Sequence, residues 1–199
     1  MEVFDGAFLI NAEDQEARRL KAYGQFNALG MEVERFPAIT PDAGAGRLKV
    51  GAIGSNLSHC AVVRLARERG YRNVAIFEDD LVFRPDFMDR WRSIAPRVGS
   101  LSYDLFYFYN WRSHDPRGAS RLVPIPGTLC VHAYVVAARY YDTFLARIMA
   151  EHTERIIDQI LLDAPAEKWA AVPNLIGQDG GISTITGRPA PLRWSARDR

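Results

Sequence analysis

The sequence predicts an α/β fold in which a Rossmann-like, mixed and mostly parallel sheet is flanked by helices. In the first half of the chain, short apolar segments alternate with longer amphipathic segments in the order β-α-β-α-β, and the connections are short. This order implies mostly parallel strand pairing and right-handed crossovers. A chain of 199 residues with 48% apolar content is long enough for one core and short for two. We therefore expect one domain over residues 1–187 and a loosely held basic tail over residues 188–199.

The first strand and helix follow from two apolar patterns. Residues 7–10 (AFLI) form a short apolar run, which is typical of a buried strand. Residues 12–29 repeat apolar side chains at three-residue steps with charged residues between them, which predicts an amphipathic helix. Gly30 suits the left-handed position that ends a helix, and residues 33–36 then predict a second strand.

A second helix leads into the central strand. Residues 51–60 (GAIGSNLSHC) open this helix, and Ser55 or Asn56 is expected to cap it. Residues 68–70 (ERG) close it. The segment 74–83 (VAIFEDDLVF) follows, and its first four residues predict a strand that is buried on both faces.

The second half of the chain continues the alternation. Pro85 is expected to begin a helix and Pro96 to end it. The other predicted segments are a strand at 104–109, a polar loop at 110–121, a strand at 130–136, a helix at 139–151, and core segments at 156–162, 169–172 and 182–185.

Three consecutive acids, Glu78, Asp79 and Asp80, follow the buried strand. Carboxylates crowded at a strand end repel one another, which raises their pKa values or requires a cation. A hard divalent ion with oxygen ligands fits this need, and ligands of open α/β sheets bind at the carboxyl ends of strands. Side-chain alternation would pair Glu78 with Asp80 and leave Asp79 to hold the turn. The alternatives are a solvated acidic turn and an N-cap for the helix at Pro85.

Composition narrows the class of protein. The formal net charge of +1 gives no field that would indicate nucleic acid as a partner. Two cysteines, Cys60 and Cys130, in apolar or small-residue surroundings indicate a reducing compartment without a disulfide framework. The first ten residues lack the basic start of a secretory signal, and no apolar run approaches the roughly 18 residues of a membrane span. We expect a cytoplasmic protein.

Several motifs occur together in an order that resembles glycosyltransferase family 25, which includes bacterial lipopolysaccharide and lipooligosaccharide sugar transferases and animal collagen galactosyltransferases. The motifs are FLINAEDQEARR (8–19), ERFPAIT (34–40), IGSNLSH (53–59), IFEDD (76–80), GTLCVHAYVVAARYYDTFL (127–145), IIDQILL (156–162) and VPNLIGQDGGIST (172–184). This chain departs from the family pattern in lacking a leucine after Asn11, in its short segment at 44–49 and in the little sequence after the last motif.

The resemblance implies a GT-A type fold and transfer of a hexose, with inversion, from a nucleotide-sugar donor such as a UDP-hexose. It also implies a Mn²⁺ or Mg²⁺ ion on the acidic motif and a glycan or lipid-linked acceptor such as lipopolysaccharide. Such an acceptor would bring the protein into peripheral contact with the inner face of the membrane. The sequence leaves the oligomeric state open.

The acids and the first strand-to-helix turn supply the predicted donor site. Asp80 is the first choice as a metal ligand, and Glu78 is the second, as a ligand or as the group that holds the donor ribose. Asn11, Arg18 and Arg19 stand where a doubly wound sheet faces a nucleotide, and they are predicted to bind its base or phosphates. A solvated helix face is the alternative for Arg19.

Two further groups complete the predicted site. Ser58 and His59 belong to IGSNLSH, where helix N-terminal amides would favour anionic groups; the assignment of His59 rests on the resemblance, and a structural histidine is its alternative. Asp158, an acid inside the apolar run 156–162, is the candidate general base. A salt bridge with Arg155 or a helix cap is the alternative for Asp158.

Gln178 and Asp179 are weaker candidates for contact with the donor or acceptor. Tyr134, Trp111 and His114 are candidates to stack on a sugar ring, although such aromatic residues are more often part of the packing. A rival function is a catalytically silent member of the same fold that binds a sugar nucleotide or a partner protein. A third is a nucleotidyltransferase or phosphohydrolase that uses the same carboxylates.

Overall fold

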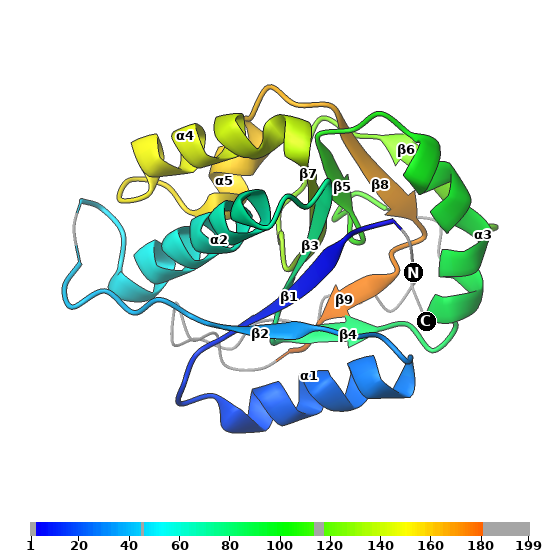
Figure 1. Ribbon diagram of the computed structural model, residues 1–199, viewed down its shortest axis with the longest axis horizontal. Coiled ribbons are helices and arrows are strands. Elements are labelled where there is room, and N and C mark those ends of the chain that lie inside the picture. Colours follow the sequence, from blue (N-terminus) through cyan, green and yellow to red (C-terminus); the bar gives the residue numbers. More distant parts are fainter. Residues whose placement is uncertain (1–2, 45, 114–117, 181–199) are drawn as a thin grey trace.

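The computed structural model describes residues 3–44, 46–113 and 118–180 (Figure 1). Its elements are β1 (Gly6–Asn11), α1 (Glu16–Ala28), β2 (Glu34–Pro37), α2 (Val50–Glu68), β3 (Asn73–Glu78), β4 (Leu81–Phe83), α3 (Phe87–Ser100), β5 (Leu105–Tyr107), β6 (Arg121–Pro124), β7 (Ala133–Ala137), η1 (Ala138–Tyr140), α4 (Tyr141–Glu151), α5 (Ile157–Leu162), β8 (Lys168–Val172) and β9 (Ile176–Gln178).

A seven-stranded sheet in the order β2-β1-β3-β7-β5-β8-β6 forms the centre of the molecule. The pairs β1·β2, β1·β3 and β5·β8 are parallel, and the pairs of β7 with β3 and β5 and of β6 with β8 are antiparallel. Five strands therefore run in one direction, and β7 and β6 run against them. The expected α/β architecture with a mixed, mostly parallel sheet is confirmed.

Helices cover both faces of this sheet (Figure 1). One hydrophobic cluster packs α1 and α3 against one face, and a second packs α2, α4 and α5 against the other. Because β3 lies in the middle of this arrangement, its residues Val74, Ala75, Ile76 and Phe77 are all fully buried. The prediction of a central strand buried on both faces is confirmed. The acidic residues that follow this strand lie where the helices no longer cover the sheet.

The glycines expected to end two helices do so. Gly30 follows α1 with a φ of 62°, and Gly70 follows α2 with a φ of 70°, in the left-handed region that glycine adopts without strain. The helix α1 begins at Glu16, after Gln15, rather than at residue 12.

Two sequence predictions about helix ends were wrong. The helix α2 begins at Val50 with Lys49 as its N-cap residue, so Ser55 and Asn56 lie inside it and cap nothing. The side chain of Asn56 instead donates to two backbone carbonyls outside α2. Pro96 does not end α3, which continues to Ser100 because the apolar face of the helix continues beyond the proline and stays buried.

Three short strands, β4, β6 and β9, were not predicted. The strand β6 covers the edge of the large sheet, and β9 pairs with β4 in a separate two-stranded sheet beside α1 (Figure 1). The predicted segment 182–185, His114 and the tail at 188–199 lie outside the described residues. Within the part of the chain that is described, Cys60 and Cys130 form no disulfide bond. None of the described helices has the length and apolar character needed to cross a membrane.

Candidate active site

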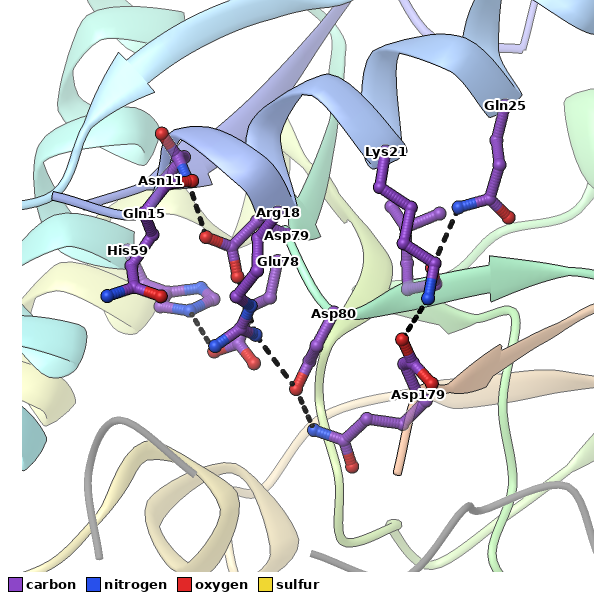
Figure 2. A network of polar contacts seen from close by, with 12 residues as sticks. Asn11, Gln15, Arg18, Lys21, Gln25, His59, Glu78, Asp79, Asp80 and Asp179 are labelled. Atoms are coloured by element: carbon purple, nitrogen blue, oxygen red, sulfur yellow. Dashed lines mark hydrogen bonds and ion pairs between the residues drawn. The ribbon is translucent and has the colours of Figure 1, made fainter. Parts of the chain in front are cut away.

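The acidic triplet lies at the carboxyl end of β3, beside the end of β1. Parallel pairing places Ile10 opposite Glu78 and therefore brings Asn11 and the start of α1 next to the three acids. The side chains of Asn11, Arg18, His59 and the acids converge in this region (Figure 2). Because β3 and β1 are adjacent and parallel, their carboxyl ends lie side by side at one edge of the sheet.

Asp79 is held by two partners from the β1–α1 segment. The Asn11 side-chain amide donates to Asp79 Oδ2 at 2.6 Å, and Arg18 Nη2 lies 2.6 Å from Asp79 Oδ1. Burial raises the pKa of Asp79 even though Arg18 and Asn11 act to lower it. The simple alternation expected along an extended strand ends at Glu78, because Asp79 and Asp80 form a turn before β4.

Asp80 faces both Arg18 and the end of β9. Gln178 Nε2 donates to Asp80 Oδ2 at 2.7 Å, and Arg18 Nη2 lies 3.4 Å from the same oxygen. The other carboxylate oxygen, Oδ1, is buried and has no hydrogen-bond partner in the described chain. Lys21 forms an ion pair with Asp179, the residue after Gln178 (Figure 2). The weaker candidates Gln178 and Asp179 are thus brought to the acidic triplet.

Glu78 belongs to a chain of contacts that runs into the core. His59 Nε2 lies 3.2 Å from Glu78 Oε1, and His59 Nδ1 lies 2.8 Å from the hydroxyl of Tyr134. Burial lowers the pKa of His59 to about 4, and burial together with neighbouring carboxylates raises the pKa of Tyr134. A neutral imidazole has one donor and one acceptor nitrogen; when Glu78 is a carboxylate, Nε2–H donates to Glu78 and the Tyr134 hydroxyl donates to Nδ1. Desolvation, followed by the charges of Asp80 and Asp158, raises the pKa of Glu78 well above its ordinary value.

Asp158 lies in the first turn of α5, on the face of the sheet that also carries His59. Its Oδ1 accepts a hydrogen bond from the backbone N–H of Val131 at 2.8 Å, just before β7. Arg155, the alternative partner, pairs with Glu151 and Asp163 instead. Asp158 is therefore oriented by β7 rather than by a neighbouring arginine, and its charge is felt at Glu78.

Two predicted donor residues are placed differently from the others. Ser58 lies in the middle of α2, away from the helix N-terminal amides that motivated its choice. Its hydroxyl donates to the carbonyl of Gly54 and accepts from the N–H of Ile39. Arg19 contacts Glu16 on the surface of α1, with 3.1 Å between Nη2 and Oε1, as its alternative interpretation expected. Both assignments stay predictions, and neither side chain contacts the acidic triplet.

The aromatic candidates differ in exposure. Tyr134 is fully buried against His59 and Tyr107, so its ring is part of the core and does not face a sugar. Trp111 is 43% exposed and is covered on one side by the guanidinium of Arg112.

His132 is a buried polar residue near these acids that sequence reasoning missed. Its backbone carbonyl accepts from the N–H of Glu78 at 2.8 Å, and its ring packs beside Tyr109. A histidine inside the apolar run CVHAYVV is the signal that would have found it, by the same logic that selected Asp158.

The donor set suits a hard divalent ion that is shared with a phosphate ligand. No group of three or more His, Cys, Asp or Glu side chains in the described residues could hold a metal ion alone. Mg²⁺ and Mn²⁺ commonly take one or two protein carboxylates and complete their shell with phosphate oxygens and water. Asp80 offers a buried oxygen without a partner, and Glu78 is the neighbouring carboxylate, so these two residues fit such an ion.

Comparison with known proteins gives one consistent family. No protein-family model matches the chain. A glycosyltransferase 25 family member of Anopheles gambiae is 30% identical over an alignment of 226 positions. This alignment covers 88% of this chain and 38% of that protein. A glycosyltransferase 25 family member of Aedes aegypti is 30% identical over 125 residues, which cover 51% of this chain and 20% of that protein. The chain thus spans well under half the length of the curated relatives it matches.

Among solved structures, a glycosyltransferase involved in the glycosylation of the major capsid of PBCV-1 is similar with a TM-score of 0.40 and 7% identity. The match covers 73% of this chain and 67% of that one.

Proposed function

Because this chain is a relative of the glycosyltransferase 25 family, we propose that it is a metal-dependent, inverting hexosyltransferase. The donor is a nucleotide sugar, with a UDP-hexose as the first choice, and the acceptor is a glycan such as lipopolysaccharide. A cytoplasmic location with peripheral contact at the inner membrane face belongs to the same proposal.

The observation that carries this proposal is the position of the acids. Glu78 and Asp80 emerge at the carboxyl end of the central strand, where ligands of α/β sheets bind. Asp80 keeps a buried oxygen without a partner, and Asp158 lies near enough to raise the pKa of Glu78. Carboxylates that are held together despite burial and mutual repulsion, with raised pKa values, are typical of functional sites.

The donor is held by residues of β1, α1 and β9 in this proposal. Asp80 and Glu78 would hold Mn²⁺ or Mg²⁺, which when bound neutralises the charge that develops on the leaving diphosphate. Arg18 carries a guanidinium that can pair with phosphate oxygens. Asn11 and Gln178 fix Asp79 and Asp80 through their side-chain amides, which keeps the carboxylates in one arrangement before the donor arrives.

His59 and Ser58 support the site from α2. His59 donates to Glu78 and so orients its carboxylate, and Ser58 fixes the segment after β2 through its bond to Ile39. Arg19 lies one residue beyond Arg18 and is the outermost member of the proposed donor site.

Asp158 acts as the general base. Its carboxylate takes the proton of the acceptor hydroxyl while that oxygen bonds to the anomeric carbon on the face opposite the leaving group. The bond from the anomeric carbon to the phosphate oxygen breaks in the same step, and its electron pair leaves with the nucleoside diphosphate. The hydrogen bond from Val131 N–H to Asp158 Oδ1 holds the base in place for this transfer.

The experiment that tests the proposal measures UDP-hexose binding by calorimetry and UDP release, each with and without Mn²⁺. Asp80→Asn is expected to abolish the metal dependence of binding and to lower turnover by at least a factor of about 10². Asp89→Asn changes an exposed carboxylate on α3 and serves as the matched control. Metal-dependent binding that is unchanged in the Asp80→Asn variant would refute the assignment of the ion.

One observation favours the rival function, a catalytically silent sugar-nucleotide-binding protein. Arg18 already lies 2.6 Å from Asp79 and 3.4 Å from Asp80, so a side chain supplies part of the positive charge that the acids need. A silent member would bind UDP-hexose equally well without a metal and release no UDP. Asp158→Asn would then leave every measured property unchanged.

A further inference from the structure

A row of three side chains crosses the sheet beside the acidic triplet. The β3·β7 register pairs Phe77 with Ala133, so the next pair is Glu78 with His132, and the hydrogen bond from Glu78 N–H to the His132 carbonyl closes it. The β5·β7 register continues in the same way and places Tyr109 opposite His132. Directly opposed residues point to the same face of an antiparallel pair.

The face of this row is the one that carries His59 and Asp158. One row deeper, Tyr134 stacks between His59 and Tyr107, which fixes the floor beneath the row. The residue before His132 holds Asp158 through its backbone N–H. His132 therefore lies between the carboxylate of Glu78 and the ring of Tyr109, close to the base.

His132 is 1% exposed, and neither ring nitrogen has a hydrogen-bond partner within the described residues. Its ring centroid lies 5.1 Å from that of Tyr109, so the neighbour on that side is an aromatic ring. Buried polar groups in proteins are almost always hydrogen-bonded, and an exception calls for an explanation such as a functional role or a bound water or ion. Both nitrogens of His132 are thus available to a group that enters the site.

We propose that His132 binds a hydroxyl group of the hexose carried by the nucleotide-sugar donor, an inference that rests on the proposed function. A neutral imidazole offers one donor and one acceptor, and a sugar hydroxyl offers the same pair in return. A phosphate offers acceptors alone and would leave one ring nitrogen unused. It would also lie between Glu78 and Asp158, where two carboxylates oppose an anion.

The burial of His132 favours the donor sugar, rather than the acceptor, as the source of this hydroxyl. The His132 ring is 1% exposed, so the sugar that it binds lies deepest in the site, and this place is assigned to the donor hexose. Tyr109 beside it is buried and packs against the His132 ring, which holds that ring in place.

The test compares UDP with UDP-glucose and UDP-galactose by calorimetry in the presence of Mn²⁺. His132→Leu is expected to weaken binding of at least one UDP-hexose by roughly tenfold and to leave UDP binding unchanged. His132→Gln keeps one donor and one acceptor and is expected to retain most of the affinity. A merely structural histidine would not change the ratio of the two dissociation constants.

Melting curves provide the control for folding. Tyr140→Phe removes another buried hydroxyl without a partner, at the opposite end of β7, and is expected to leave the ratio unchanged. His132→Leu is expected to melt at or above the wild-type temperature, because it removes polar atoms that have no partner in the fold. If it does not fold, His132→Met takes its place, because methionine also lacks the nitrogen donor and acceptor of the imidazole, and it is judged by the same ratio.

Two failures are distinguishable. A wild-type protein that binds neither UDP nor a UDP-hexose refutes the proposed function. A wild-type protein that binds both, with the same UDP to UDP-hexose ratio in a folded His132→Leu or His132→Met variant, overturns the role of His132 alone.

Discussion

The contact between Tyr134 and His59 gives the sharpest quantitative prediction. The Tyr134 hydroxyl is hydrogen-bonded to His59 Nδ1 across 2.8 Å, and both side chains are fully buried. Tyr134→Phe leaves Nδ1 without a partner in the core, which costs about 1–3 kcal/mol of unfolding free energy. For a domain of this size each kcal/mol shifts the melting temperature by roughly 2–4 °C, so the expected fall is roughly 2–12 °C.

Tyr107 offers a matched control in the same layer. Its ring stacks on Tyr134 with centroids 5.9 Å apart, and its buried hydroxyl has no hydrogen-bond partner in the described chain. Tyr107→Phe removes the same atom from the same surroundings without breaking a hydrogen bond. We expect its unfolding free energy to change by less than about 0.5 kcal/mol or to rise.

Urea unfolding followed by circular dichroism measures both variants. The slope of unfolding free energy against urea should be the same in each, because the surface exposed on unfolding does not change. Equal losses in Tyr134→Phe and Tyr107→Phe would show that the hydroxyl contact with His59 contributes nothing. In that case His59 would not be oriented by Tyr134, and its role in positioning Glu78 would have to be abandoned.

Two further predictions concern other carboxylates. Asp158→Asn is expected to lower UDP release by about 10²–10⁴-fold while UDP binding persists, whereas Asp163→Asn, on the exposed end of α5, keeps the wild-type rate; equal rates in both variants would exclude Asp158 as the base. Burial acts to raise the pKa of Asp5, but hydrogen bonds from Arg72 and its backbone hold it below the ordinary value. Asp5 therefore stabilises the fold above about pH 4, and the difference in unfolding free energy between wild type and Asp5→Asn should shrink as the pH falls below that value; a difference that is constant with pH would contradict this assignment.

The sequence predicted the elements whose burial repeats along the chain. Strand β3 is apolar on both faces, and α1 has charged residues between apolar ones, so each pattern has one structural solution. The sequence did not predict the strands β6 and β9, because each is short and each pairs with a partner that is distant in sequence. The sequence predicts a helix end at Pro96 because a proline lacks one backbone donor, yet the buried face of α3 outweighs that loss.

The candidate site divides in the same way. The acidic triplet and Asp158 are visible in the sequence, because charges within apolar runs are costly unless they have a function or a partner. The partners are not visible. Gln178 meets Asp80 only because β9 pairs with β4, and His132 meets Glu78 only because the β3·β7 register fixes it. Ser58 belongs to a motif that predicts a helix start, because Ser55 and Asn56 are good cap residues, but the helix begins earlier, at Val50.

The balance of charge around Arg18 separates the two functions considered for this chain. One guanidinium stands within 3.4 Å of Asp79 and Asp80, and Glu78 lies beside them with a neutral His59 as its partner. A nucleotide-sugar donor brings a diphosphate, which adds negative charge to a site where the carboxylates already outnumber this arginine. The single positive charge of Arg18 cannot neutralise the diphosphate and both aspartates together, because the negative charge of these groups exceeds it. We therefore expect donor binding to require a further cation beside Asp80, and a measurement of UDP binding with and without Mn²⁺ would distinguish a working transferase from a silent relative.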